Sequence, residues 1–481
     1  MISTFRLAAE GGRGAEESAA VTAAIMRAVK SGTIDPTRTR TVADWVQYRQ
    51  NFREPIALRR LSTPGTSGDT EIAFDLRRAK PDDLDAVLAR AIDGADEADA
   101  VYLEEWTRAS KSVIWQFNLM YWSDLGLWEE VTGKDYAQAL PGGESAATNT
   151  DAARAIILEL FRIWDGLVER HALPDQLTVL ELGVGNGDQA KVWLDEFVKI
   201  DKEQGRDYYR RLHYLMGDYS SLVLDLARAN TTEHHARVST LVLDAARPLE
   251  TLRFLESKVF FVFISNVYDN LPTDELAVID DRLYQVEMRA YLPGPAAARI
   301  AEGINAKPDQ IMDLTKRLLR LGPRLLAESA PDLFENALTA TSFWQEVYGA
   351  LRIAERYTPL GPLDAYEICE GITGELLGPM TDGYGDVRFH VSNGAVASFI
   401  ETLPLLHPLG LFVCHDLFVT DLEQFQTGFR GPGKYDGSVV NWVNGPILKT
   451  SASRRGFAVE FSPFAHGSKS PISTATARAR D

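Results

Sequence analysis

Cysteine and histidine are scarce in this chain. Its 481 residues include two cysteines, Cys369 and Cys414, and eight histidines. The cysteines stand far apart and form no Cys-x-x-Cys pair, which excludes a disulfide framework and a cysteine-rich zinc site. The histidines show no His-x-x-x-His or His-Glu-x-x-His spacing. We therefore predict no metal site.

Long apolar runs and an excess of positive charge are missing too. The longest apolar run, residues 259–264, is far shorter than the roughly 20 residues that a membrane helix needs. The N-terminus lacks the basic start and the continuous apolar stretch of a signal peptide. Fifty basic residues against 68 acidic ones give a formal net charge of −18. This charge argues against nucleic acid or an anionic membrane as a partner, and we predict a cytoplasmic protein.

The composition that remains is that of a globular protein. Hydrophobic residues make up 45% of the chain and charged residues 25%, which excludes a mainly disordered chain and provides material for a core. At about 150 residues per domain, the length predicts two or three units. The residues leave open whether the chain forms a homodimer.

Short apolar strands alternate with helices in the middle of the chain. A strongly periodic helix begins at Asp151. The strands that we predict cover residues 177–182, 212–216, 238–243 and 259–264, and helices are predicted at residues 188–200 and 220–230. Unbroken apolar strands between helices are typical of a parallel sheet covered on both faces. We predict an α/β fold with a Rossmann-like sheet.

The remaining segments are predicted to surround this sheet. Residues 151–279 and 396–465 would form the sheet domain, and residues 280–395 a mostly helical insertion between strands four and five that caps the substrate. Residues 330–357 are predicted to be one of its longest helices. Residues 1–150 would be a helical N-terminal extension whose tryptophans pack it onto the larger domain or help to roof a ligand cleft. Residues 466–481 are rich in Ser, Ala and Arg and are predicted to be a flexible tail.

A glycine-rich turn follows the first predicted strand. The sequence there is Glu181-Leu182-Gly183-Val184-Gly185-Asn186-Gly187-Asp188, with a helix predicted to start at once. Glycine leaves no side chain in the way, so a ligand can lie against the backbone, and the free N–H groups at the helix start would face it. A dinucleotide site would want Gly-x-Gly-x-x-Gly for its pyrophosphate. Here the third glycine comes one residue early, and an acid precedes the first glycine by two residues.

This Gly-x-Gly-x-Gly pattern, with an acid two residues before the first glycine, resembles motif I of the class I S-adenosylmethionine-dependent methyltransferases. The resemblance implies that the turn wraps the aminoacyl and ribose portion of S-adenosyl-L-methionine, with Glu181 near the methionine part. Acids also end the next two strands. Asp218 matches the residue that binds ribose hydroxyls, and Asp244 with Ala245 matches the pair that reads the adenine amino group. The full set of cofactor-binding residues that we predict comprises Glu181, Gly183, Gly185, Asn186, Gly187, Asp218, Tyr219, Asp244, Ala245 and Ser265.

Polar residues follow the fourth strand in the sequence Ser265-Asn266-Val267-Tyr268-Asp269-Asn270-Leu271-Pro272. This segment resembles the Asn-Glu-x-x-Asp-Ala-x-Pro stretch of the MidA-like methyltransferases, which include a mitochondrial complex I assembly factor that methylates protein arginine. Asp269 and Pro272 match the Asp and the Pro of that pattern, whereas Asn266 lies one residue nearer to them than the Asn of the pattern and is followed by Val267 in place of a Glu. The resemblance implies N-methylation of a protein side chain, with Asp269 as the catalytic carboxylate and Asn266 and Tyr268 as positioning groups. His415-Asp416, which follow strand five, are a second candidate for a base.

Other functions stay open at this point. A small-molecule O- or N-methyltransferase would bind its acceptor under the insertion, and a non-catalytic assembly factor would keep the fold alone. A nicotinamide-dependent oxidoreductase is disfavoured by the glycine spacing. The sequence contains no Gly-x-x-x-x-Gly-Lys-[Ser/Thr] motif, so a P-loop NTPase is excluded, and no Gly-x-Ser-x-Gly elbow of an α/β-hydrolase.

Overall fold

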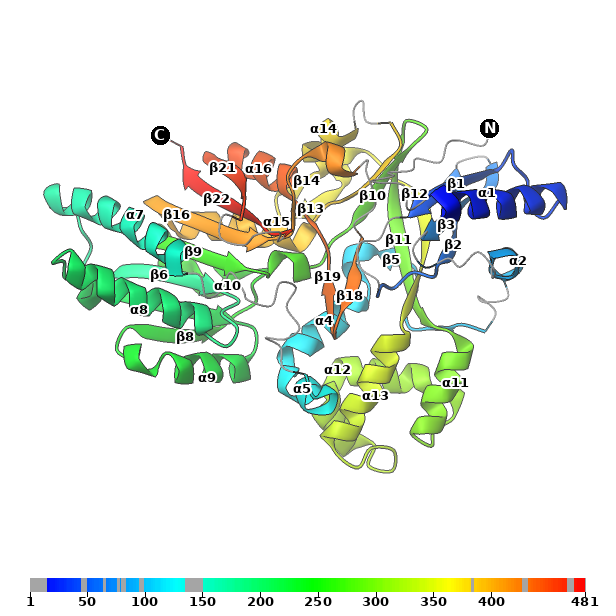
Figure 1. Cartoon of the computed structure of the whole chain (residues 1–481), viewed down its shortest axis with the longest axis horizontal. Helices are drawn as coiled ribbons and strands as arrows, with labels where there is room; N and C mark the ends of the chain where they lie inside the picture. Colours follow the sequence, from blue (N-terminus) through cyan, green and yellow to red (C-terminus); the bar gives the residue numbers. More distant parts are fainter. Residues whose placement is uncertain are drawn as a thin grey trace.

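A computed structural model gives the arrangement of most of the chain. It describes residues 15–44, 50–63, 66–75, 78, 84–94, 99–134, 150–381, 385–425, 431–464 and 471–480. Figure 1 shows a layered α/β unit on one side of the molecule and a second sheet with its own helices on the other. Among the described residues, no helix is both long and apolar enough to span a bilayer.

The first sheet has seven strands in the order β21-β22-β16-β9-β6-β7-β8. They are β6 (Leu177–Leu182), β7 (Leu212–Asp218), β8 (Val238–Val242), β9 (Val259–Ser265), β16 (Leu406–Asp416), β21 (Phe457–Pro463) and β22 (Ser473–Ala479). The five strands from β8 to β16 are parallel, and β22 runs antiparallel to both of its neighbours. This arrangement confirms the predicted α/β fold class with its Rossmann-like sheet.

Helices cover both faces of this sheet, which explains why every residue of β6 is buried. The helices of one face are α7 (Thr150–Glu169), α8 (Asp188–Glu203) and α9 (Ser221–Asn230). Those of the other face are α10 (Pro248–Leu252), α15 (Asn393–Thr402) and α16 (Gly445–Arg454). Trp164 of α7 and Trp193 of α8 are buried on the first face, while Phe399 of α15 packs on Phe412 of β16 on the second, with ring centroids 5.1 Å apart.

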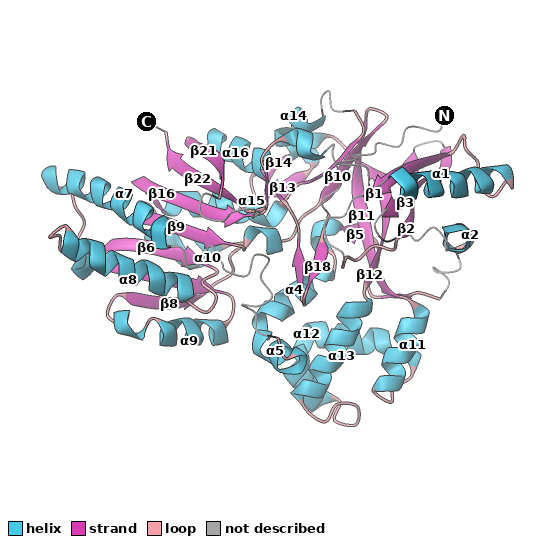
Figure 2. Cartoon of the chain, in the orientation of Figure 1, coloured by secondary structure: helices cyan, strands magenta, loops and turns pink. Residues whose placement is uncertain are grey.

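The second sheet has nine strands, which come from residues 39–108 and 275–390 (Figure 2). Its strands are β1 (Thr39–Asp44), β2 (Ile56–Thr63), β3 (Thr66–Asp75), β4 (Val101–Tyr102), β5 (Thr107–Arg108), β10 (Glu275–Ile279), β11 (Arg282–Leu292), β12 (Arg352–Pro359) and β15 (Val387–His390). The helices α1 (Ala15–Lys30) and α2 (Leu84–Asp93) pack on β2 and β3 through a small apolar core. The helices α11 (Gly294–Gly303), α12 (Ile311–Ser329) and α13 (Ala337–Ala350) connect β11 to β12.

Smaller elements link the two sheets. They are α4 (Ile114–Ser123), α5 (Leu125–Thr132), β13 (Glu367–Cys369), β14 (Ile372–Thr373), α14 (Gly378–Thr381), β17 (Phe418–Val419), β18 (Gly433–Tyr435), β19 (Ser438–Val440) and β20 (Val443–Asn444). The hairpin β18–β19 contacts α4, and its side chain Lys434 reaches α13. The sheet domain and the insertion are therefore joined by packed structure as well as by the chain.

The secondary structure of the extension and the insertion needs a correction. The predicted helices are present in both segments, but each segment also contributes strands to the nine-stranded sheet. The predicted helix at residues 330–357 ends with α13 at Ala350, and strand β12 follows it. Buried ions hold this sheet together, since Glu355 of β12 accepts hydrogen bonds from Arg53 (2.7 Å) and Arg59 (2.7 Å). Because the buried residue Glu355 is charged, it interrupts the alternation of apolar and polar residues that predicts a strand.

The end of the chain also differs from the prediction. Residues 473–479, part of the predicted flexible tail, form strand β22 between β16 and β21. Ala475 and Ala477 are buried there. Small side chains such as alanine give only a weak apolar pattern, so the sequence does not predict this strand. The strand forms because its position between two others gives it backbone hydrogen bonds on both sides. Residues 466–470 and 481 lie outside the described part of the chain.

Candidate active site

The parallel strands bring the predicted site residues to one edge of the sheet. Leu182 at the end of β6 pairs with Gly217 of β7 and with Ile264 of β9. The turns that follow these strands therefore begin side by side, as expected for the carboxyl edge of a parallel sheet, where α/β proteins bind their ligands.

The glycine turn has the backbone that its sequence predicts. Gly183, Gly185 and Gly187 all have positive φ, at 74°, 57° and 83°. A Cβ atom on Gly187 would lie 2.7 Å from Cα of Ala227 in α9, so this glycine allows the turn to pack on the helix. A Cβ atom on Gly185 would meet no described atom within 4 Å. Two glycines thus serve packing or conformation, and the face of Gly185 is open to a ligand.

Glu181 lies directly beneath this turn. Its side chain is only 3% exposed, and the hydroxyl of Tyr214 donates a hydrogen bond of 2.6 Å to Glu181 Oε2. Burial raises the pKa of Glu181 to about 8, and the nearby charge of Asp218 acts in the same direction, while the Tyr214 hydrogen bond opposes them. The carboxyl is therefore mainly protonated at neutral pH and is held by Tyr214 of the neighbouring strand β7.

Asp218 contacts the turn directly. Its Oδ2 accepts a 3.2 Å hydrogen bond from the backbone N–H of Gly185, and its Oδ1 accepts one of 3.1 Å from Ser220 N. Burial raises the pKa of Asp218, and these N–H donors oppose the shift. The neighbouring Tyr219 is 41% exposed. An acceptor carboxylate and an uncovered aromatic ring therefore stand together beside the open glycine.

The third strand supplies a more exposed carboxylate. Asp244 is exposed, and its Oδ1 accepts a hydrogen bond of 2.8 Å from Ala246 N within its own turn. Ala245 is half-buried. Leu243 packs on Gly217 of β7, because a Cβ atom on that glycine would lie 2.7 Å from Leu243 Cδ2. Asp244 thus lies at the same sheet edge as Asp218, with one oxygen engaged locally.

The turn after β9 rests against the glycine turn. Ser265 and Asn266 are half-buried, and Asn266 has a left-handed backbone with φ of 51°. A Cβ atom on Gly183 would overlap Cγ2 of Val267, so the Val267 side chain covers this glycine. The side chain of this turn that touches the predicted cofactor turn is therefore apolar.

Two of the three predicted catalytic residues point elsewhere. Tyr268 is 1% exposed and its ring lies in the core against Phe412 (centroids 6.4 Å apart), so the prediction that it positions a substrate is wrong. Asp269 is 5% exposed, and its Oδ1 accepts a 2.6 Å hydrogen bond from Asn270 Nδ2. Burial and the neighbouring carboxylate of Asp416 raise the pKa of Asp269 well above its usual range. This carboxyl faces inward as a neutral group.

His415 also points away from this edge. Its Nδ1 lies 2.9 Å from Thr474 Oγ1 of β22, and its ring contacts Phe263 and Phe464. It lines a groove of about 500 Å³ between α7 and the β16–β22–β21 face, away from the glycine turn. The hypothesis that His415 and Asp416 act together as a base is wrong, since the two side chains face opposite sides of β16.

Two asparagines that the sequence prediction missed hold this region together. Asn118 of α4 donates to Asn270 O (2.7 Å) and accepts from Val439 N (2.8 Å). Asn441 donates through its backbone N (2.9 Å) and its Nδ2 (2.8 Å) to Asp269 O. The signal for Asn118 was an uncharged polar residue in the middle of an apolar helix. The signal for Asn441 was absent, because only the fold brings it to the loop.

Trp115 and Trp128 of the extension serve packing, whereas Trp45 lies outside the described residues. The Trp128 ring lies 4.7 Å from that of Trp344 in α13, and Trp128 Nε1 donates to Asp436 Oδ2 (2.8 Å) at the tip of the β18–β19 hairpin. Trp115 is 7% exposed and donates to Ala109 O. Since Asn118 on α4 contacts the turn after β9, this helix still lies next to the candidate site.

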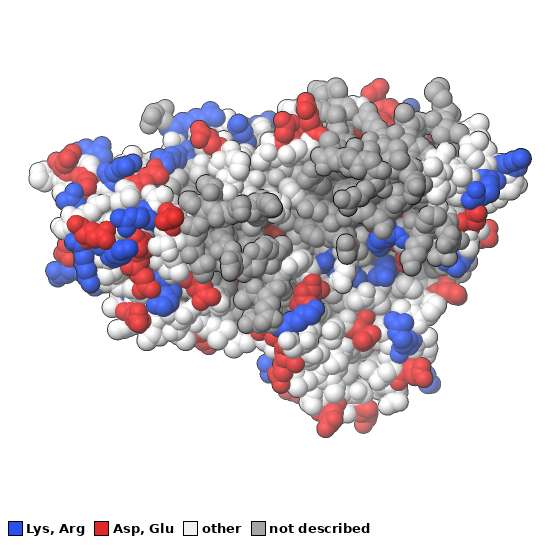
Figure 3. All heavy atoms as spheres, in the orientation of Figure 1, with Lys and Arg blue, Asp and Glu red and all other residues white. Residues whose placement is uncertain are grey.

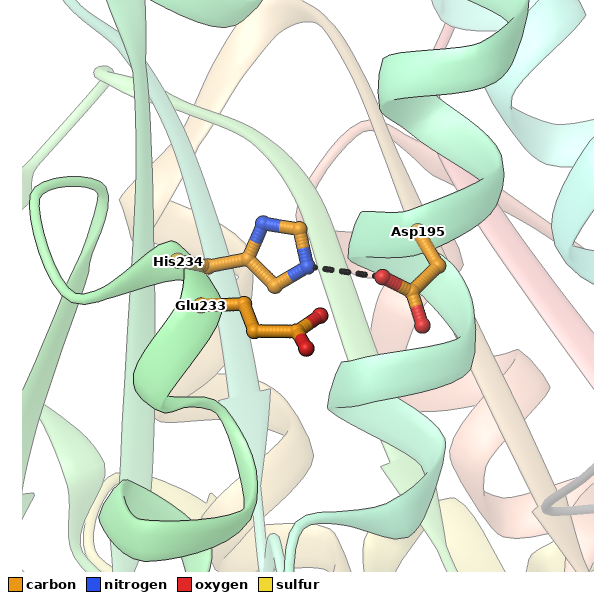
Figure 4. Close-up of side chains that lie close together, drawn as sticks. All are labelled: Asp195, Glu233 and His234. Atoms are coloured by element: carbon orange, nitrogen blue, oxygen red, sulfur yellow. Dashed lines mark hydrogen bonds and ion pairs between the residues drawn. The ribbon is translucent and has the colours of Figure 1, made fainter.

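Among the described residues, Asp195, Glu233 and His234 form a group with metal-ligand atoms within 4.8 Å of one another (Figure 4). Lys191 Nζ already binds Asp195 Oδ2 (3.0 Å) and Glu233 Oε2 (3.4 Å). His234 Nε2 lies 3.0 Å from Asp195 Oδ1, and its Nδ1 lies 2.8 Å from the Tyr209 hydroxyl. Both ring nitrogens of His234 and the carboxylates of Asp195 and Glu233 therefore have partners. We interpret the group as a set of surface ion pairs.

Charges of both signs are mixed on one face of the molecule. In the face that Figure 3 shows, Lys and Arg side chains lie among Asp and Glu side chains over the region of α7, α8 and α9. Several of these charges form pairs along a helix, such as Arg228 with Asp225 at 3.1 Å. On this face, the described side chains form no continuous basic stripe of the kind that nucleic-acid-binding proteins present.

Comparison with known proteins gives only distant matches. No family model matches the chain, and no curated protein sequence matches it. Among solved structures, a COG1565 superfamily protein from Burkholderia thailandensis is 12% identical, with 82% of this chain and 91% of that chain covered and a TM-score of 0.47. A COG1565 member from the same organism, bound to S-adenosyl-homocysteine, is 13% identical over the same shares, with a TM-score of 0.45. The CcbJ methyltransferase from Streptomyces caelestis is 10% identical, with 76% and 99% covered and a TM-score of 0.33.

Proposed function

We propose that the chain is a methyltransferase that uses S-adenosyl-L-methionine. The observation that carries the proposal is the open face of Gly185, whose N–H is bound by the Asp218 carboxylate at the carboxyl edge of the sheet. A nucleoside without phosphate needs backbone that it can approach and acceptors for its hydroxyls, and this edge offers both. Residues 151–279 and 396–465 would bind the cofactor, while residues 1–150 and 280–395 would form the acceptor side.

Each described residue of the edge has a role in this proposal. Asp218 would accept hydrogen bonds from the ribose hydroxyls, and the exposed Tyr219 would cover the base. Asp244 would accept from the adenine amino group through its remaining oxygen. Glu181 would stay protonated and hold the turn. Asn186 and Ser265 would line the ends of the cofactor site.

A sulfonium donor supplies a methyl group that its positive charge has already activated. The protein then has to hold the acceptor atom in line with the donor, at roughly 3–3.5 Å from the carbon that it attacks. Of the predicted catalytic residues, we retain Asn266, whose half-buried side chain follows the strand that adjoins the glycine turn. Its amide can orient an acceptor by hydrogen bonds, and Val267 beside it excludes water.

For the acceptor we propose two candidates. The match of Asp269 and Pro272 to the MidA-like pattern favours a nitrogen of a protein side chain such as arginine. The inward-facing Asp269 and the apolar Val267 favour a small molecule with a neutral oxygen or nitrogen, because a guanidinium needs ionised carboxylates nearby. Transfer of radiolabelled methyl into a cell lysate, followed by acid hydrolysis, separates them. Labelled methylarginine in the hydrolysate would support the protein side chain as acceptor. Label recovered in an organic extract of the lysate would support the small molecule.

Titration calorimetry with S-adenosyl-homocysteine tests the cofactor. We expect saturable binding to the wild type and at least tenfold weaker binding to Gly185→Arg, because the new side chain fills the open face of the turn. Gly205→Arg is the matched control, since Gly205 has a similar φ (62°) and similar free space but lies at the far end of α8. Wild-type protein that binds NAD and not S-adenosyl-homocysteine would refute the proposal.

A further inference from the structure

The turn after β9 is held from the neighbouring strand by one carboxylate. Asp416, the last residue of β16, accepts hydrogen bonds at Oδ2 from Tyr268 N (2.8 Å) and Asp269 N (3.4 Å). Its Oδ1 accepts a third from Leu417 N at 2.7 Å. One side chain thus satisfies N–H groups of two separate turns at the same sheet edge.

A second contact from β16 fixes the start of this turn. The carbonyl of His415 accepts a 2.9 Å hydrogen bond from Asn266 N, in the residue with left-handed backbone. A non-glycine residue in that conformation is strained and persists only where the surroundings impose it. His415 O and the Asp416 carboxylate supply that constraint from two adjacent residues.

The Asp416 side chain is fully buried, and the groups around it are neutral. The Asp269 carboxyl, the Tyr268 hydroxyl and the Cys414 thiol face it, and burial raises the pKa of each well above its usual range. The ring of His415 turns to Thr474 on the opposite side of the strand. Asp416 is therefore the group of this set that carries the negative charge, and the N–H donors of the turn are what stabilise it.

We propose that Asp416 is a positioning residue of the cofactor site. Its carboxylate holds residues 266–270 so that Val267 rests on Gly183 and Asn266 keeps its conformation next to the glycine turn. The inference deepens the proposed function and rests on it for the identity of the ligand. Asp416 itself touches no reacting atom in this account and acts through the turn.

Hydrogen–deuterium exchange and calorimetry on the full chain test this role together. Asp416→Asn and Asp416→Ala remove the charge, and Asp225→Asn, which breaks an exposed pair with Arg228, is the control. In the two Asp416 variants we expect exchange of the amides of residues 266–270 to become at least tenfold faster. We expect affinity for S-adenosyl-homocysteine to fall at least tenfold, and the control to match the wild type in both measurements. If Asp416→Ala does not fold, the isosteric Asp416→Asn carries the test.

The pH dependence of S-adenosyl-homocysteine affinity distinguishes the positioning role from a merely structural one, which would not change it. Burial raises the pKa of Asp416 to about 6, opposed by the N–H donors. Protonation below that pH weakens its acceptance of the N–H bonds, so wild-type affinity for S-adenosyl-homocysteine should fall as the pH is lowered through about 6. The ratio of wild-type to Asp416→Asn affinity should shrink over the same interval, since the amide of Asp416→Asn does not titrate and the carboxyls outside the Asp269–Asp416 pair titrate alike in both proteins.

The outcomes separate this inference from the proposed function. Unchanged exchange of residues 266–270 in folded Asp416→Asn would overturn the positioning role, and so would faster exchange with full affinity and an unchanged pH profile. Wild-type protein that shows no binding of S-adenosyl-homocysteine, while the variants still exchange faster, would refute the cofactor and leave the anchoring of the turn in place.

Discussion

At the scale of single residues, the chemistry of the candidate site depends on buried carboxyls. The folded chain raises the pKa of Glu181 to about 8 from an ordinary value near 4.5. Below pH 4.5 the carboxyl is protonated in both the folded and the unfolded chain. Between about 4.5 and 8 the unfolded chain releases this proton more readily, so the contribution of Glu181 to stability is lost as the pH rises.

Glu181→Gln should remove this pH dependence, because the amide imitates the protonated carboxyl. We expect the melting temperature of the wild type to fall relative to that of Glu181→Gln between pH 5 and pH 8.5. Thermal unfolding followed by circular dichroism at several pH values measures the difference. Parallel curves for the two proteins would show that Glu181 is ionised in the folded chain.

The residue scale also shows what the sequence could and could not predict. Gly183, Gly185, Gly187, Asp218 and Asp244 lie at one sheet edge because each follows a parallel strand, and strands with unbroken apolar runs are readable from sequence. The direction of a side chain beyond the strand is not. Tyr268 and Asp269 lie three and four residues beyond the end of β9 at Ser265, where strand alternation no longer predicts the direction of a side chain. The short helical turn Tyr268–Asn270 rotates both into the core.

At the scale of elements, a buried ammonium fixes the end of α13. Lys434 Nζ donates to Tyr348 O (2.7 Å), Gly349 O (3.0 Å) and Leu351 O (2.7 Å), where the last helical carbonyls lack partners. Lys434 is 6% exposed and sits over the rings of Phe52 and Tyr348. It ties the β18–β19 hairpin to the insertion.

Lys434→Met should lower the free energy of unfolding by about 2–4 kcal/mol, because three carbonyls lose a charged donor in a buried place. Lys449→Met on the exposed face of α16 is the control and should change stability by less than about 0.5 kcal/mol. Denaturant unfolding of both variants gives the comparison. A loss that is equal in the two variants would contradict the capping role.

The elements that sequence reasoning missed are strands of the second sheet. Strand β11 buries Tyr284, Val286, Met288, Ala290 and Leu292 in strict alternation, a signal that was present in the sequence and overlooked. Strand β12 was hidden, since its buried Glu355 lies between Ile353 and Tyr357. Its partners Arg53 and Arg59 lie about three hundred residues earlier in the chain, and local patterns hold no information on such pairing.

At the scale of the whole molecule, Asp274 joins segments from three parts of the chain. It is fully buried and accepts hydrogen bonds from Arg108 Nε (2.9 Å), Ser110 N (2.9 Å) and the Tyr366 hydroxyl (2.7 Å). It follows the turn after β9 by a few residues. The N-terminal extension and the insertion are thereby held against the candidate site by one carboxylate.

Asp274→Ala should destabilise the protein by about 3–5 kcal/mol, since it leaves the Arg108 charge without its buried partner. Asp69→Asn, in an exposed pair with Arg38, should have little effect. Thermal unfolding of the two variants checks this expectation. A melting temperature for Asp274→Ala within one degree of the wild type would show that the extension is held by other contacts.

The central claim is that the turn at Gly185 binds S-adenosyl-L-methionine. A crystal structure of the chain with S-adenosyl-homocysteine tests it most directly. The account predicts the ribose hydroxyls on the Asp218 carboxylate, the adenine between Tyr219 and Asp244, and the homocysteine along residues 183–187 beneath Val267. A ligand bound at another place, or a glycine turn that stays empty at saturating ligand, would contradict it.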